Sequence, residues 1–332
     1  MDALPTVWFV LIAVLWIGYL FLEGFDLGVG MLMKLFAREN RERRVLLNTV
    51  GPVWDGNEVW LITAIGATFA AFPHWYAALL SALYLPMILV LLGLIFRAVG
   101  FEYRGKVSSE RWRSCWDWAI FAGSLVAAFG VGVALVMTTT GLPLNANGDR
   151  VGGAFAWFNG YALLGGTAVV LFCLIQALAF LALKTDGTVR TRARRLFARW
   201  APPALLPLLA WAVVVELGSA KPLGWLLLLL AGLAASAAIL WARRGREGWS
   251  FLFLGVFLLA VMSSIFYNLY PRVLPSTLGE SFDLTVQNAS SSAYTLGLMS
   301  VIACFGVPLV LAYQGWTYWV FRKRISTASI PG

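Results

Sequence analysis

The amino-acid sequence predicts an all-α integral membrane protein that crosses the bilayer about nine times. Of its 332 residues, 60% are hydrophobic and 12% are charged, whereas soluble domains carry roughly 25% charged residues. Apolar runs of about 20 residues, long enough to cross a hydrocarbon core, recur along the chain. Basic residues gather in every second segment between these runs.

The apolar runs and the turn signals between them predict one membrane domain over residues 1–332. Within it, residues 1–140 hold four helices, residues 155–270 hold four more, and residues 294–321 form the last. The polar, serine-rich external segment 271–293 is expected to be an ordered loop or a short surface helix. The predicted spans are 7–33, 49–72, 75–97, 115–138, 155–183, 201–219, 223–242, 249–270 and 294–321.

The distribution of basic residues predicts how the helices are oriented. Of the 25 Lys and Arg, 22 lie in the segments that follow the first, third, fifth, seventh and ninth spans, and only Arg150, Lys221 and Arg272 lie on the other side. By the positive-inside rule the N-terminus is outside and the C-terminus is cytoplasmic, as an odd number of spans requires. Topology and contact with anionic lipid explain the net charge of +9, so we expect no nucleic-acid partner.

Carboxylates inside the predicted spans are the first candidates for function, because each costs about 2.5–3.5 kcal/mol at the bilayer centre. Glu23 and Asp26 share a face of the first helix, and Asp55 and Glu58 repeat this spacing on the second. Counting ~1.5 Å per residue from the cytoplasmic ends places Asp26 and Asp55 both about 10–12 Å into the membrane. Intramembrane acids mark proton or substrate pathways, and we favour that interpretation for this pair.

A polar cluster is expected nearby on the cytoplasmic side. Arg97 ends the third predicted helix and Asp117 opens the fourth. We expect Asp26, Arg97 and Asp117 to lock helices one, three and four together, and a bound water or cation would fit among them. A structural role as buried ion pairs is the alternative. Glu216, near the external end of its helix, is expected to be a solvated terminus.

Residue types that are scarce also limit the chemistry. The single histidine, His74, lies at an external turn, so this chain alone cannot supply paired axial ligands for several haems. Its three cysteines are far apart and suggest neither a metal pair nor a disulfide. We therefore expect no metal site on this chain and assign any redox metal to a partner. Tyr313, Gln314 and Trp316 of the last helix are expected to pack or to form part of an aromatic belt.

Four sequence blocks in the first four predicted helices together resemble one family, subunit II of the cytochrome bd-type, cyanide-insensitive quinol oxidases. Residues beyond 155 resemble it only in helix count, polarity and the serine-rich external loop, and the external segment at Lys221 is shorter than in some members. The blocks are residues 24–30 (GFDLGVG), 54–61 (WDGNEVWL), 96–104 (FRAVGFEYR) and 111–118 (RWRSCWDW).

The resemblance implies a heterodimer with a subunit I that bears haem b and haem d, oxidises quinol and reduces oxygen to water. It places the chain in the bacterial cytoplasmic membrane as a multi-pass respiratory subunit, with lipid and small single-span subunits as further partners. Subunit II is implied to be haem-poor, to hold a structural quinone and to supply part of a cytoplasmic proton-uptake path. The residues expected on this path are Asp55, Asp26, Glu58, Glu23 and Trp60, and no catalytic residue is expected on this chain.

A proton- or cation-coupled secondary transporter is the main alternative, because carboxylates at membrane depth also bind coupling ions. Broken helices and a symmetric second half would favour it, and the sequence offers neither clearly. A purely structural membrane scaffold is the third interpretation. Haem absorption in the purified complex would distinguish the oxidase from a colourless transporter.

Overall fold

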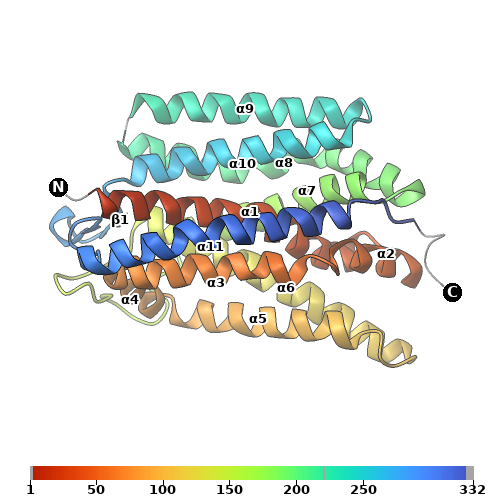
Figure 1. Cartoon of the computed structure of the whole chain (residues 1–332), viewed down its shortest axis with the longest axis horizontal. Coiled ribbons are helices and arrows are strands. Elements are labelled where there is room, and N and C mark those ends of the chain that lie inside the picture. The colour runs from red at the N-terminus through yellow and green to blue at the C-terminus, as the bar shows by residue number, and fades with distance from the viewer. Residues whose placement is uncertain (1–2, 220, 327–332) are drawn as a thin grey trace.

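The computed structural model describes residues 3–219 and 221–326. Figure 1 shows long helices that lie side by side along the longest axis of the molecule, with the start of α1 and the end of α11 at opposite ends. The helices of the described residues are α1 (Leu4–Leu35), α2 (Asn40–Val50), α3 (Trp54–Ala71), α4 (Pro73–Ala82), α5 (Tyr84–Tyr103), α6 (Glu110–Thr140), α7 (Gly160–Lys184), α8 (Gly187–Ser219), α9 (Pro222–Arg243), α10 (Glu247–Leu269) and α11 (Ala293–Val320).

Eight helices of the described chain, α1 and α5 to α11, are long and apolar enough to cross a membrane. They match eight of the nine predicted spans. The remaining predicted span, 49–72, corresponds to α3, which has 18 residues and carries Asp55, Asn57 and Glu58 in its first two turns. Although it is less apolar, α3 lies within the bundle against α1 and α11 (Figure 1).

Several helix ends differ from the prediction for local reasons. The predicted span 75–97 is divided at Leu83 into α4 and α5, because Pro86 has no N–H to donate to the carbonyl four residues earlier. Two basic segments predicted as loops are helical, as α2 and the first part of α8. Arginine is a good helix former, so a high charge does not prevent a helix.

The predicted external segment is an ordered loop rather than a surface helix. Strand β1 (Arg272–Leu274) pairs antiparallel with β2 (Leu284–Thr285), and the short 3-10 helix η1 (Glu280–Phe282) lies between them. Asp283 accepts a hydrogen bond of 2.7 Å from the backbone N–H of Ser276. The loop therefore closes on itself at the end of the bundle where α1 begins (Figure 1).

Helix α1 lies at the centre of the fold, and glycines allow its close approach to α7. A Cβ atom at Gly28 would collide with the backbone carbonyl of Cys173, and one at Gly24 would collide with the side-chain oxygen of Gln176. This GxxxG pair thus brings two backbones together, as small residues do in membrane bundles. Gly56 of α3 has no such role within the described chain, because a Cβ atom there would meet nothing within 4 Å.

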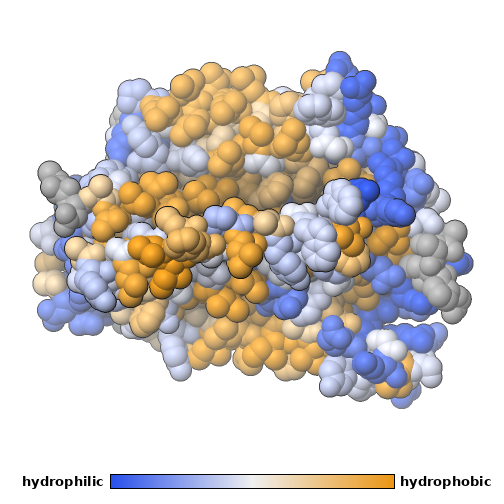
Figure 2. Space-filling model, viewed as in Figure 1, coloured by the Kyte–Doolittle hydropathy of each residue, from blue (hydrophilic) through white to orange (hydrophobic). Residues whose placement is uncertain are grey.

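Figure 2 shows that hydrophobic residues cover the middle of this face, whereas hydrophilic residues gather at the two ends, most strongly at the end where α2 lies. This pattern is that of a polytopic membrane protein. The end with α2 also holds the arginine-rich segments, so the positive-inside rule assigns it to the cytoplasmic side.

Candidate functional site

A carboxylate–arginine cluster, formed by Glu23, Glu58 and Arg97, lies inside the bundle. The guanidinium of Arg97 on α5 is fully buried, 2.8 Å from Oε1 of Glu23 on α1 and 3.3 Å from Oε2 of Glu58 on α3. The Glu23 side chain is also fully buried, whereas that of Glu58 is 17% exposed. Two carboxylates thus share one cation, and a proton bound to either would leave the cluster neutral.

A second group, the amide network of Asp26, Asn57, Trp60, Gln314 and Tyr318, joins α1, α3 and α11. Asn57 donates to Oδ2 of buried Asp26 at 2.6 Å. Its own side-chain oxygen accepts from the Tyr318 hydroxyl at 2.8 Å and from Gln314 at 3.1 Å. The Trp60 indole N–H donates to the Gln314 oxygen at 2.9 Å. Within the described chain, Oδ1 of Asp26 is buried without a hydrogen bond.

The contact between Asn57 and Asp26 sets the level at which α3 begins. The first turns of α3 lie beside Asp26, nine residues before the end of α1. Asp55 in that first turn is exposed and forms no hydrogen bond or ion pair through its side chain with the described residues, whereas Glu58 lies one turn further along α3. Asp55, Glu58 and Glu23 therefore run from an exposed to a fully buried position.

Asp117 does not join Arg97, so the expected cluster of Asp26, Arg97 and Asp117 is wrong in this arrangement. The Asp117 carboxylate instead lies 2.5 Å from Nε of Arg104 and 3.4 Å from a guanidinium nitrogen of Arg43. Helix register explains the difference, because Arg97 faces Gly123, with 3.1 Å between its Cβ and a Cβ built on that glycine. Asp117 lies six residues earlier on α6, or ~9 Å away along the axis.

The amide network contains residues that sequence reasoning missed. Gln314 was expected to be packing or belt, and Asn57 and Tyr318 were not considered as site residues. Gln314 and Tyr318 are four residues apart, which places both on one face of α11. Two polar side chains four residues apart in an apolar helix are the sequence signal that could have identified this network.

Glu216 is a further correction, because it is buried and not a solvated terminus. Its carboxylate accepts hydrogen bonds from Asn268 and from the Ser264 hydroxyl of α10. A Cβ atom at Gly224 of α9 would collide with the same carboxylate. The neighbouring helix thus leaves room for Glu216, and α10 supplies the donors that a buried carboxylate needs.

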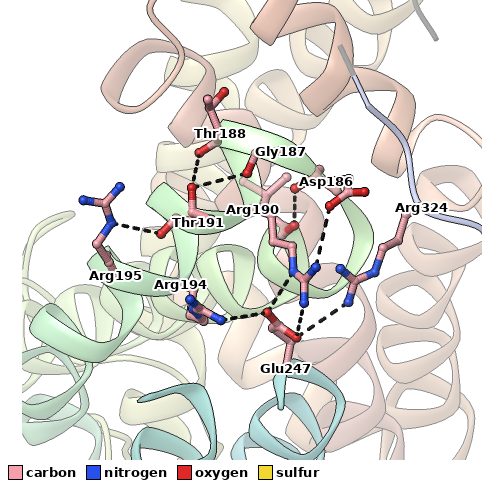
Figure 3. A network of polar contacts seen from close by, with 11 residues as sticks. Asp186, Gly187, Thr188, Arg190, Thr191, Arg194, Arg195, Glu247 and Arg324 are labelled. Atoms are coloured by element: carbon pink, nitrogen blue, oxygen red, sulfur yellow. Dashed lines mark hydrogen bonds and ion pairs between the residues drawn. The ribbon is translucent and has the colours of Figure 1, made fainter. Parts of the chain in front are cut away.

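A third polar group, the Glu247 cluster, lies at the arginine-rich end of the bundle. Figure 3 shows Glu247, the first residue of α10, facing Arg190 and Arg194 of α8 and Arg324 of the C-terminal segment. Arg190 donates two hydrogen bonds to it, at 2.9 and 3.1 Å, and the other two arginines lie 3.6 Å away. This buried carboxylate joins two helices and the C-terminal segment.

Glu42 of α2 forms a smaller ion pair with Arg192 of α8, at 2.8 Å. Partial burial alone would raise the pKa of Glu42. The hydrogen bonds from Arg192 and from the backbone N–H of Arg38 outweigh that effect and hold its pKa below the usual range. Glu42 thus fixes α2 against α8 in its ionised form.

Comparison with known proteins assigns the chain to a family. A sequence model of the family "Cytochrome bd terminal oxidase subunit II" matches residues 4–321. Cytochrome bd ubiquinol oxidase subunit 2 of Bacillus subtilis is 42% identical over 98% of both chains. Cytochrome bd-I ubiquinol oxidase subunit 2 of Escherichia coli K12 is 35% identical over 99% of this chain and 97% of that protein.

A solved structure of bd oxidase from Geobacillus thermodenitrificans shares the fold, with a TM-score of 0.80 over 96% of this chain and 99% of that chain. Its sequence identity is 18%, so this likeness supports the fold alone. Family model, full-length relatives and fold agree, and the chain therefore belongs to the cytochrome bd terminal oxidase subunit II family.

Proposed function

We propose that, within a cytochrome bd oxidase, this chain supports a haem-bearing subunit I and contributes a proton-uptake path from the cytoplasm. Relatives that match over their full length are named as subunits of ubiquinol oxidases, which are oxidoreductases. This assignment supports the oxidase subunit and not the secondary transporter. Reduction of oxygen to water consumes protons, so such a complex needs a route for them through the bilayer.

The proposed route begins at Asp55, continues to Glu58 and ends at the buried Glu23. Asp55 and Glu58 are three residues apart on α3 and therefore share a face. Glu58 and Glu23 contact the same guanidinium of Arg97. The observation that carries this proposal is the shared cation, because one guanidinium balances only one of two carboxylates and leaves the other able to take up a proton.

The amide network is proposed to position this route rather than to carry protons. The indole N–H of Trp60 donates its hydrogen bond to Gln314. Trp60 therefore holds α11 against α3. Asp26 is titratable, and one of its oxygens has no hydrogen bond within the described chain, so it is proposed as a side branch that stores a proton. Glu23 and Asp26 lie one turn apart on α1.

Replacement of Glu23 by Gln tests this function. The amide keeps the size of the side chain and cannot carry a transferable proton, so we expect an assembled complex with roughly tenfold slower quinol oxidase turnover, a barrier increase of about 1.4 kcal/mol. Glu110→Gln, at an exposed carboxylate on the same side, is the control. Normal turnover in an assembled Glu23→Gln complex would show that the cluster is only structural.

Haem b and haem d are proposed to bind the partner subunit. The only histidine, His74, is exposed at the start of α4, outside both buried polar groups. Among the described residues, no three His, Cys, Asp or Glu side chains gather as a metal site. This donor set does not fit a haem held by imidazole. We therefore propose that this chain supports subunit I and conducts protons.

A structural quinone is proposed for a cavity of about 450 Å³ that aromatic side chains line between α1, α7, α10 and α11. Phe25 stacks on Phe180 with ring centroids 4.1 Å apart, and Phe251 packs against both rings. Flat apolar walls suit a quinone ring or its isoprenoid tail. Solvent extraction of the purified complex should recover bound quinone, and Phe251→Ala should lower the recovery, whereas Phe305→Ala on the exposed face of α11 should not.

Subunit I, small single-span subunits and lipid are proposed as the partners that cover the remaining helix faces. Among the described helices that could span a membrane, α11 has the least buried surface, and its side chains include exposed Phe305 and Leu309. Because the named relatives are bacterial proteins, the bacterial cytoplasmic membrane is the proposed location.

A further inference from the structure

A second cavity, of about 440 Å³, opens between α2, the start of α3, the end of α5 and the start of α6. It lies outside the buried carboxylates, at the arginine-rich end of the bundle. We name it the arginine pocket because Arg44, Arg104 and Arg113 all line it. Glu102 is the one acidic residue in its wall, so the lining carries an excess of positive charge.

The arginine pocket has a rigid wall. Arg104 is 4% exposed, and its guanidinium is held by Asp117 at 2.5 Å and by the Asn40 side chain at 2.8 Å. Those two partners tie α2, α5 and α6 together behind the cavity. A fixed guanidinium loses little conformational entropy when a ligand binds, which favours recognition.

Arg113 supplies a charge that the fold does not neutralise. Its side chain is half-buried in the pocket wall, and it forms no ion pair or hydrogen bond with the side chains of residues 3–219 and 221–326. By contrast, Arg104 beside it has a carboxylate partner. An arginine held in a cavity without a counter-charge favours an anionic ligand, and guanidinium groups bind phosphate through two parallel hydrogen bonds.

The rest of the wall indicates an amphiphilic ligand. Trp54 and Phe101 line the cavity and pack edge to face, with ring centroids 5.3 Å apart. Leu47 and Val50 of α2 add further apolar surface. A phosphate beside an apolar wall at the cytoplasmic surface describes a phospholipid headgroup, and basic pockets between membrane helices on that side bind anionic lipids.

We propose that the arginine pocket binds the phosphate headgroup of an anionic phospholipid. Arg113 and Arg44 face the phosphate, while Arg104 and its partners fix the wall. The bound headgroup bridges α2 to the turn between α5 and α6. A free phosphate ion shares this chemistry but lacks the acyl chains that the apolar wall accommodates.

The test uses the purified oxidase complex, titrated separately with phosphatidylglycerol, phosphatidylcholine and inorganic phosphate. Bound lipid is counted by native mass spectrometry, and the melting temperature is measured in parallel. Phosphatidylglycerol should bind and raise the melting temperature, whereas phosphatidylcholine should do neither. Arg113→Gln should weaken phosphatidylglycerol binding about fivefold, the effect of about one basic residue at a membrane surface. Arg111→Gln, exposed on the same helix and outside the pocket, should bind as the wild type does.

Equal phosphatidylglycerol binding by Arg113→Gln and Arg111→Gln would overturn the proposal. Saturation by inorganic phosphate alone, sensitive to Arg113→Gln, would support the anion site and assign it to a free ion. Loss of subunit I from Arg113→Gln with unchanged lipid binding would overturn the proposal in favour of a subunit contact. Because the Arg113 side chain has no protein partner among the described residues, its replacement should not unfold the chain.

Discussion

Arg97 is the residue on which the buried carboxylates most depend. It is fully buried and contacts both Glu23 and Glu58. Arg104, the next arginine along the chain and the residue that follows α5, is held by Asp117 and does not contact these carboxylates. Removal of one partner from a buried ion pair leaves an uncompensated charge and costs about 3–5 kcal/mol.

We therefore expect Arg97→Ala to reduce assembly of the complex and its haem content. Assembly is measured by recovery of both subunits, and haem content by the visible spectrum. Arg111→Ala, at an exposed arginine, is the matched control and should assemble normally. Full assembly and normal stability of Arg97→Ala would contradict the central role of this guanidinium.

At the scale of residues, the sequence predicted which charged residues are buried in the bundle more successfully than it predicted which of them form pairs. The helical repeat alone predicts that Glu23 and Asp26 share one helix face and that Asp55 and Glu58 share another. It could not predict that Arg97 faces Gly123 while Asp117 meets Arg104, because the register between α5 and α6 depends on packing of both helices. The neutral members of the amide network gave no charge signal.

The ends of α8 and α10 at the arginine-rich end of the bundle are held together by the Glu247 cluster (Figure 3). Three arginines gather at one carboxylate that is 5% exposed, while the arginines are about one-third exposed. An amide at this position would keep some hydrogen bonds but leave the arginines to repel one another. Loss of hydrogen bonds to a charged group costs roughly 1.5–3 kcal/mol.

We expect Glu247→Gln to lower the melting temperature of the complex without changing quinol oxidase turnover. Asp186→Asn is the control in the same cluster, because Asp186 is 59% exposed and pairs with Arg190 alone, at 3.6 Å. Its replacement should change the melting temperature little. Equal effects of the two substitutions would show that burial of Glu247 does not matter.

The contact of α2 with α8 should depend on pH through Glu42. Its pKa is lowered in the folded state from the ordinary value of 4.5. The ion pair with Arg192 therefore contributes stability above that ordinary value, and this contribution is lost as the pH falls through the lowered pKa. Glu42→Gln should melt earlier than the wild type at pH 7, by a difference that shrinks toward zero in acid. A difference that grows on acidification would reverse the sign and reject this account.

Helix positions followed from hydropathy, whereas helix interruptions followed from local chemistry. The break at Leu83 depends on the missing N–H of Pro86. From the sequence alone, a proline at this position is compatible with one continuous helix or with two helices. Helix α3 was predicted five residues too early, because the segment before Trp54 belongs to the separate helix α2 and its turn. Apolar runs do not distinguish one long helix from two short ones.

At the scale of the whole molecule, the orientation in the membrane stays a prediction of the basic residues. The start of α1 and the end of α11 lie at opposite ends (Figure 1), which fits an odd number of crossings. A reporter fused after Arg324 should be active in the cytoplasm, and one fused after Gly141, between α6 and α7, should be active outside. A C-terminal reporter active only outside would invert the assignment.

We propose that carboxylates of this chain conduct protons. Asp55→Asn tests this proposal most directly, because Asp55 is the proposed entrance, is exposed and has no side-chain partner among the described residues. The measurement is proton uptake by the reduced complex during a single turnover with oxygen, followed by a pH indicator across a range of pH. We predict an assembled, haem-replete Asp55→Asn complex whose proton uptake is slowed, with wild-type kinetics in the Glu110→Gln control. Wild-type uptake kinetics in Asp55→Asn at every pH would contradict the account.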